Sequence, residues 1–260
     1  MITAVTGLTG VGKTHWIREQ VAQSEQPVCY FKPDSAVPID SLNLAIEFPH
    51  AQVLHPGEEE QLLALAETDR QVYLELPWHL DLASLEPLLQ RLGCRRVAIA
   101  PTEAAGSEWQ TWANEIVVSN AAAGETLVQL HRQPDGLQIH QGLLTGEIID
   151  WASLSVFWFE LIQGAYGKVI RAKGIFDIVS GESIYGDFVY GTVNPEFLAL
   201  DLPRWLEGRP ERLSGFEIVG YNLDKAGITQ TLKQCCVPES HIEYYQQQMK
   251  QSLAMEEATR

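Results

Sequence analysis

The residues with the clearest capacity for chemistry lie near the N-terminus, in the stretch GLTGVGKT at positions 7–14. Two glycines bracket four residues and a Lys-Thr pair follows, a pattern typical of loops that wrap phosphate groups. Glycine lets backbone N–H groups converge on an anion, and the positive end of the following helix adds to the attraction. Lys13 is expected to reach the β- and γ-phosphates of a nucleotide, and the Thr14 hydroxyl is expected to hold Mg²⁺. The residues expected to contact the nucleotide here are Gly7, Gly10, Val11, Gly12, Lys13, Thr14 and His15.

A site that transfers phosphate also needs an acid near the metal or the attacking water, on a neighbouring strand. Glu75 follows three apolar residues in QVYLEL, so it ends a predicted buried strand. We expect it to be the catalytic acid that places the water; the alternative is a solvated residue at a strand end. Asp34 and Asp40 follow another predicted strand, where a mobile switch segment would lie, and no local pattern distinguishes them.

The first half of the chain must position these residues, and it alternates short apolar runs with amphipathic segments. Strands are predicted at residues 2–7, 27–31, 71–76, 95–101 and 113–120. Apolar residues at helical spacing predict helices at residues 15–23, 58–68 and 82–92. Strand and helix in repetition predict a parallel sheet covered on both faces, with ligands at the carboxyl ends of the strands. The loop at 7–14 stands at that end of the first strand.

The pattern changes after about residue 125, so we expect two domains, 1–125 and 126–260. Residues 126–142 predict a hairpin, because two alternating runs flank Asp135-Gly136. Further strands are predicted within 168–179, 183–193 and 211–223. Helices are predicted from 154, from Asp224 and along the polar tail after 239. The predicted fold is α/β: a parallel-sheet P-loop NTPase domain followed by a small α+β C-terminal domain.

Composition narrows the classes of partner. The net charge of −16 argues against general binding to nucleic acid or to anionic membranes, which need clustered Lys and Arg. No apolar run reaches the roughly 18 residues that a membrane helix needs. The N-terminus lacks the basic start and long apolar core of an export signal, so a cytoplasmic location is expected. The cysteines Cys29, Cys94, Cys235 and Cys236 are then expected to be free thiols.

Several of these stretches resemble the CobW-like GTPases, a branch of P-loop proteins whose characterised members include metallochaperones and metal-insertion factors. GLTGVGKTHWI resembles the phosphate loop of that family, and VYLEL resembles its strand ending in an acid, here Glu75. ANEIVVSN is similar to the strand that leads to its guanine-reading Asn-Lys-x-Asp, which makes Asn120 a nucleotide-binding residue. KVIRAKGIFDI and RLSGFEIVGYNLD are similar to strands of the family's C-terminal domain, so the similarity covers nearly the whole chain.

Three departures from that family pattern affect metal binding, the hinge and the recognition of guanine. The segment 40–61 contains no cysteine, whereas the family carries a Cys-x-Cys-Cys metal motif there. Trp78 stands where a Glu-x-x-Gly hinge would place glycine. Ala121 and Ala123 replace the Lys and Asp that read guanine, so the base would lose its carboxylate partner. Together these changes indicate a degenerate member of the family.

Two other groups of residues have side chains that could bind a metal. A two-residue turn at Asp135-Gly136 would place His131 opposite His140, where two imidazoles could share a metal. Both lie among glutamines, which favours an ordinary exposed pair. Cys235-Cys236, with a histidine and a glutamate nearby, is better explained as the buried end of a helix. Neither group replaces the missing cysteine motif, so the sequence identifies no zinc or other transition metal.

Two functions of different classes follow. The first is a Mg²⁺-dependent nucleotide-binding protein, GTP by resemblance with ATP not excluded, that delivers a metal or assembles a metalloprotein with weak or lost hydrolysis. The alternative is a pseudo-GTPase scaffold that binds a client or assembly-partner protein. An ATP-using kinase-like enzyme is a third reading, which no acceptor site in the sequence supports.

Overall fold

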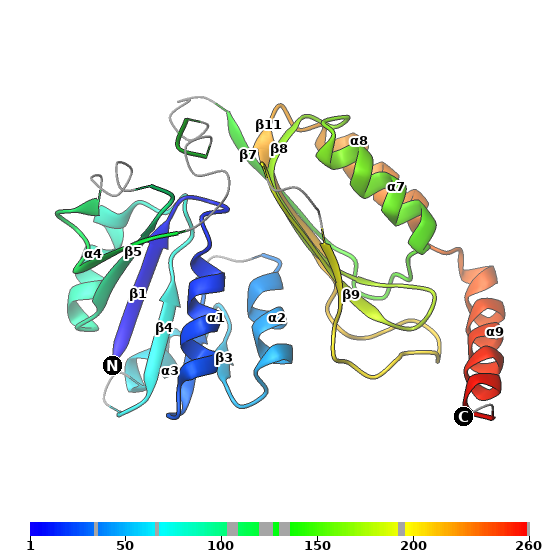
Figure 1. Ribbon diagram of the computed structural model, residues 1–260, viewed down its shortest axis with the longest axis horizontal. Helices are drawn as coiled ribbons and strands as arrows, with labels where there is room; N and C mark the ends of the chain where they lie inside the picture. The colour runs from blue at the N-terminus through cyan, green and yellow to red at the C-terminus, as the bar shows by residue number, and fades with distance from the viewer. Residues whose placement is uncertain are drawn as a thin grey trace. The chain divides into compact units, whose positions relative to one another are not determined.

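The computed structural model in Figure 1 describes residues 1–33, 36–65, 68–102, 109–119, 127–129, 136–191 and 196–258. The chain divides into two compact units. Unit 1 consists of Met1–Asp135 and Tyr190–Thr192, and unit 2 consists of Gly136–Val189 and Val193–Arg260. Each unit has its own sheet and its own buried core. No helix among the described residues is long and apolar enough to cross a membrane.

Unit 1 is built on a six-stranded parallel sheet with the order β3-β2-β4-β1-β5-β6. The strands are β1 (Ile2–Gly7), β2 (Val28–Phe31), β3 (Gln52–Leu54), β4 (Gln71–Glu75), β5 (Arg95–Ala100) and β6 (Glu115–Val118). The parallel sheet predicted from the alternating pattern is confirmed. The sequence missed β3, which has three residues and lies at the edge, because so short a run carries no periodic signal.

Helices cover both faces of this sheet (Figure 1). They are α1 (Lys13–Gln23), α2 (Ile39–Glu47), α3 (Glu59–Leu65) and α4 (Leu82–Arg91). Ile17 of α1 and Leu44 of α2 share one core with Tyr30 and Tyr73. Leu62 of α3, with a leucine of α4, belongs to the core of the other face. The sequence did not predict α2, which includes Asp40 of the expected switch segment.

Unit 2 contains an antiparallel sheet with the order β10-β9-β8-β11-β7. Its strands are β7 (Leu137–Leu143), β8 (Lys168–Asp177), β9 (Ser183–Val189), β10 (Glu196–Ala199) and β11 (Gly215–Tyr221). Helices α7 (Trp151–Ile162) and α8 (Lys225–Cys235) pack on one face, where Phe157, Trp158 and Leu232 meet Phe176 and Phe216. Helix α9 (Glu239–Ala258) anchors through Ile242. The predicted C-terminal α+β architecture is confirmed.

Strand β8 forms ion pairs with both of its neighbours in the sheet. Lys173 Nζ lies 2.8 Å from Glu217 Oε1 on β11. Arg171 pairs with Asp187 on β9 and also donates to the Phe188 carbonyl at 2.9 Å. These cationic side chains therefore connect three strands of the sheet.

The predicted hairpin at 126–142 is wrong. Residues 127–129 are helical, and β7 pairs with β11, which lies more than seventy residues further along the chain. His140 lies opposite Ile218 in that pairing. A turn signal favours the nearest partner along the chain, whereas β7 forms its ladder with β11 from Leu137 to Leu143.

Candidate functional site

The loop between β1 and α1 has the backbone geometry that its glycines predict. Gly7, Gly10 and Gly12 have φ values of 149°, 74° and 101°. A Cβ on Gly7 would lie 2.4 Å from the carbonyl oxygen of Ile99 on β5, so only glycine fits there. Gly12 is the N-cap of α1 in the left-handed conformation, and no side chain caps that helix. The first N–H groups of α1 therefore keep their capacity to bind an anion.

Lys13 is held inside this loop. Its side chain is buried, and its Nζ donates to the carbonyl oxygens of Gly7 at 2.8 Å and Leu8 at 3.0 Å. Val11 is fully buried in the unit 1 core, so a ligand would meet its backbone and not its side chain. His15 lies on the exposed side of α1, where Nε2 is 3.4 Å from Glu19.

Thr14 and Glu75 meet at the carboxyl end of the sheet. The Thr14 hydroxyl lies 2.9 Å from Glu75 Oε2 and 3.1 Å from Oε1, and it donates to this carboxylate. Glu75 is 2% exposed, and the Tyr30 hydroxyl donates to its Oε2 at 2.9 Å. The sequence placed these two residues in one site, and they come from elements 61 residues apart.

Two further charged residues complete this cluster. Lys32, directly after β2, forms an ion pair with Asp40 near the start of α2, and its Nζ lies 3.4 Å from Glu75 Oε1. Sequence reasoning missed Lys32 and left Asp40 undistinguished. The sequence carried no signal for Lys32, because the register of the folded sheet brings it to Glu75: Tyr30 pairs with Tyr73 and Phe31 with the next residue of β4.

The oxygen donors of the cluster fit a magnesium ion. Mg²⁺ prefers oxygen ligands, few of them from the protein, with phosphate oxygens completing its shell. The Thr14 hydroxyl and the Glu75 carboxylate are such donors, in hydrogen-bonding contact with each other. Thr14 would hold the ion directly, and Glu75 would orient Thr14 and the ion's water ligands. Bound Mg²⁺ would supply charge neutralisation for the phosphates.

Some predicted positions lie outside the described residues. They are Asp34, Asn120, Ala121, Ala123 and His131. Trp78 is described: it follows β4 and contacts His79 edge to face, with ring centroids 5.4 Å apart. The position where the family pattern expects glycine therefore carries a bulky aromatic side chain two residues after buried Leu76.

The four cysteines are free thiols that are hard to deprotonate. Burial raises the pKa of Cys29, Cys94, Cys235 and Cys236 to about 11 in each case. Among the described residues, no group of three or more His, Cys, Asp or Glu side chains could hold a metal ion. His140 Nε2 lies 2.9 Å from the Thr229 hydroxyl, and burial, with Lys225 nearby, lowers the pKa of this imidazole.

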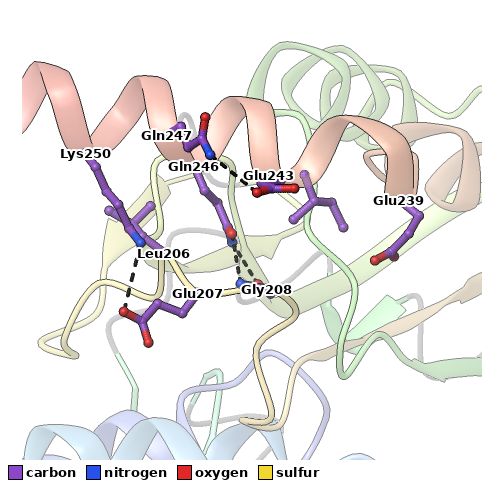
Figure 2. A pocket seen from close by; sticks show the side chains of 9 residues that line it. Leu206, Glu207, Gly208, Glu239, Glu243, Gln246, Gln247 and Lys250 are labelled. Carbon is purple, nitrogen blue, oxygen red and sulfur yellow. Dashed lines mark hydrogen bonds and ion pairs between the residues drawn. The ribbon is translucent and has the colours of Figure 1, made fainter.

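A surface pocket of about 460 Å³ lies in unit 2, between residues 206–208 and α9 (Figure 2). Gln246 spans its floor: its amide accepts from the Gly208 N–H at 2.8 Å and donates to the Gly208 carbonyl at 2.7 Å. Glu207, Glu243 and Lys250 reach its rim (Figure 2). The lining includes no histidine, cysteine or hydroxyl side chain. These contacts attach α9 to the unit and offer no reactive group.

Comparison with known proteins gives only distant similarities. No protein-family model matches the chain, and no curated protein does. The crystal structure of the Zn(II)-bound YjiA GTPase from E. coli aligns over 90% of this chain and 98% of its own, with 14% identity and a TM-score of 0.31. A Zn(II)-bound triple mutant of YjiA aligns over the same shares, with 16% identity and the same TM-score. Likeness this distant assigns no family, and the proposals below do not rest on it.

Proposed function

We propose that unit 1 binds the phosphates of a nucleoside triphosphate, with Mg²⁺, in the loop from Gly7 to Thr14. The supporting observation is the contact between Thr14 and the buried Glu75, at 2.9 Å and 3.1 Å. P-loop NTPases use a hydroxyl residue of the loop and an acid at the end of a neighbouring strand to position Mg²⁺. GTP is the favoured base because of the resemblance to CobW-like GTPases, and ATP is the alternative.

Hydrolysis is expected to be weak or lost. Both oxygens of Glu75 accept a hydrogen bond from Thr14, one also accepts from Tyr30, and Lys32 lies close to the other. A carboxylate held by three such groups is suited to orient its neighbours and is poorly placed to activate water. Trp78, in the place of the family's hinge glycine, also opposes the movement that couples hydrolysis to a change of shape.

The cellular role that we propose is that of a metallochaperone or metalloprotein assembly factor that acts on a client protein. Its support is the sequence resemblance of the phosphate loop, the acidic strand and the two C-terminal strands. The alternative is a pseudo-GTPase scaffold, in which bound nucleotide only fixes the shape that the partner recognises. The tight engagement of Glu75 favours this second reading, because it opposes turnover.

The proposal is tested by titrating the purified chain with GTP, ATP and their diphosphates, with and without Mg²⁺. We expect Mg²⁺-dependent binding that Lys13→Ala weakens about 10- to 100-fold, because a charge-assisted bond to phosphate contributes roughly 1.5–3 kcal/mol. Lys250→Ala, which changes an exposed lysine of α9, is the matched control and should bind as the unaltered chain does. Failure to bind any nucleotide at millimolar concentration would remove this function.

The two roles separate in a second measurement. Slow but Lys13-dependent release of phosphate would support a GTPase that delivers metal, and binding without release would support the scaffold. Dialysis against zinc or cobalt, followed by metal analysis, tests the metal role independently. A substoichiometric metal content would argue against a metallochaperone.

A further inference from the structure

The charge balance of the phosphate-loop site has a feature that nucleotide binding does not explain. Asp40 is 4% exposed and Glu75 is 2% exposed, so two carboxylates are buried close together. Buried charges are costly unless they are paired and hydrogen-bonded. The Lys32 ammonium lies against both: it is ion-paired to Asp40 and 3.4 Å from Glu75. The three groups sum to one negative charge.

This ammonium stands where a divalent cation would be attracted. Mg²⁺ binds carboxylate and hydroxyl oxygens at roughly 2.0–2.1 Å, and the available oxygens here belong to Thr14, Glu75 and Asp40. Glu75 Oε1 accepts from Thr14 at 3.1 Å and faces Lys32 as well. A metal ion drawn to these carboxylates without nucleotide would have to compete with a cation that is covalently part of the chain.

We propose that Lys32 is a built-in counter-cation that suppresses metal binding at this site until a nucleotide arrives. This inference rests on the proposed function, because it assumes that the loop binds a nucleotide. Without nucleotide, Lys32 offsets one of the two carboxylate charges, and Mg²⁺ enters only with the phosphates, which add negative charge of their own. Lys32 thereby determines which cation the site accepts: the complex of Mg²⁺ with nucleotide, and not the free ion.

Removal of the lysine charge should create a site for free Mg²⁺. In Lys32→Met the Asp40 and Glu75 carboxylates lose the ammonium that offsets one of their two negative charges. A divalent cation that prefers oxygen ligands would then offset those charges. In the double variant Lys32→Met/Asp40→Asn one carboxylate is removed with the ammonium, so the cluster returns to a single negative charge, as in the unaltered chain.

The experiment uses Mg²⁺ alone, without nucleotide, and follows thermal unfolding of the full chain. With about 10 mM MgCl₂ against NaCl of equal ionic strength, we expect the Tm of Lys32→Met to rise by about 3 °C or more, since a ligand of the folded state stabilises it. The unaltered chain and the double variant should shift by less than about 1 °C on the same scale. Because nucleotide is absent, the outcome is independent of whether the chain binds GTP or ATP.

The proposal is overturned if Mg²⁺ does not raise the Tm of a folded Lys32→Met. It is also overturned if Mg²⁺ raises the Tm of the unaltered chain or of the double variant as much as that of Lys32→Met. If Lys32→Met is unfolded, recovery of the fold on adding Mg²⁺ supports the proposal. If Lys32→Met does not fold in either salt, Lys32→Gln replaces it, because the glutamine amide keeps an N–H donor for the carboxylates. A folded Lys32→Gln whose Tm does not rise with Mg²⁺ counts against the proposal.

Discussion

Burial decides which reactive side chains of this protein are chemically accessible. Glu75 and Lys13 are buried, yet both face the phosphate loop, where a ligand would meet them. Burial also affects the cysteines, because it disfavours the thiolate of Cys29 and Cys235. Removal from water therefore leaves Lys13 and Glu75 in reach of a charged ligand, and it makes the thiols unreactive.

The cysteines supply a test at this scale. A pKa of about 11 leaves each thiol protonated near neutral pH, and the thiolate forms only as pH rises toward 11. Since the thiolate is the nucleophile, we expect little labelling by iodoacetamide at pH 8 in the folded chain. Mass spectrometry should show full labelling at the same pH in denaturant. Rapid labelling of any cysteine in the folded chain would contradict the assigned burial.

At the scale of elements, the two helices on the sheet of unit 2 begin after an aspartate that caps them. Helix α8 follows Asp224, whose Oδ1 accepts from the Gly227 N–H at 2.9 Å. Helix α7 follows Asp150, whose carboxylate accepts from the Ser153 N–H at 2.8 Å. Helix α1 differs from α7 and α8, because Gly12 at its N-cap has no side chain. The first N–H groups of α1 are therefore left for the phosphate that this loop is expected to bind.

The cap of α8 gives a measurable consequence. Asp224→Ala should lower the free energy of unfolding by about 1 kcal/mol, because the Gly227 N–H loses its acceptor. Asp224→Asn keeps an acceptor at the same position and should lose much less. Denaturant titrations of both variants check this prediction. Equal losses for the two substitutions would show that the negative charge, and not the hydrogen bond, stabilises the helix.

At the scale of the whole molecule, two cores of different construction share one chain. Unit 1 has a parallel sheet with apolar clusters on both faces, and unit 2 has an antiparallel sheet with its main cluster under α7 and α8. The phosphate loop and all the residues proposed around it belong to unit 1. We therefore expect nucleotide binding to stabilise the units unequally.

Calorimetry can show this difference. We expect two unfolding transitions, of which only the one from unit 1 moves when nucleotide and Mg²⁺ are added. At a nucleotide concentration near 100 times Kd the gain is about 2.7 kcal/mol, on the order of 10 °C for a unit of this size. At the same nucleotide concentration, Lys13→Ala should reduce the shift to about half or less and leave the second transition in place. A single transition that moves as a whole would instead indicate that the units unfold together.

The sequence by itself determined the phosphate loop, the parallel sheet beneath it and the helices of unit 2. These features depend on local signals: glycine spacing, apolar periodicity and capping residues act within a few positions of each other. Glu75 was also found this way, because it ends an apolar run. The short β3 was missed because three residues carry no period, and α2 was missed although its apolar residues have helical spacing.

Only the tertiary structure decided which residues surround Glu75 and which strand accompanies β7. Lys32 reaches Glu75 through the register of β2 beside β4, and Asp40 joins them because α2 packs over the same face. Strand β7 pairs with β11 and not with its neighbour in sequence. In both cases the pairing of strands brings together residues that are far apart along the chain, and no local pattern records that pairing.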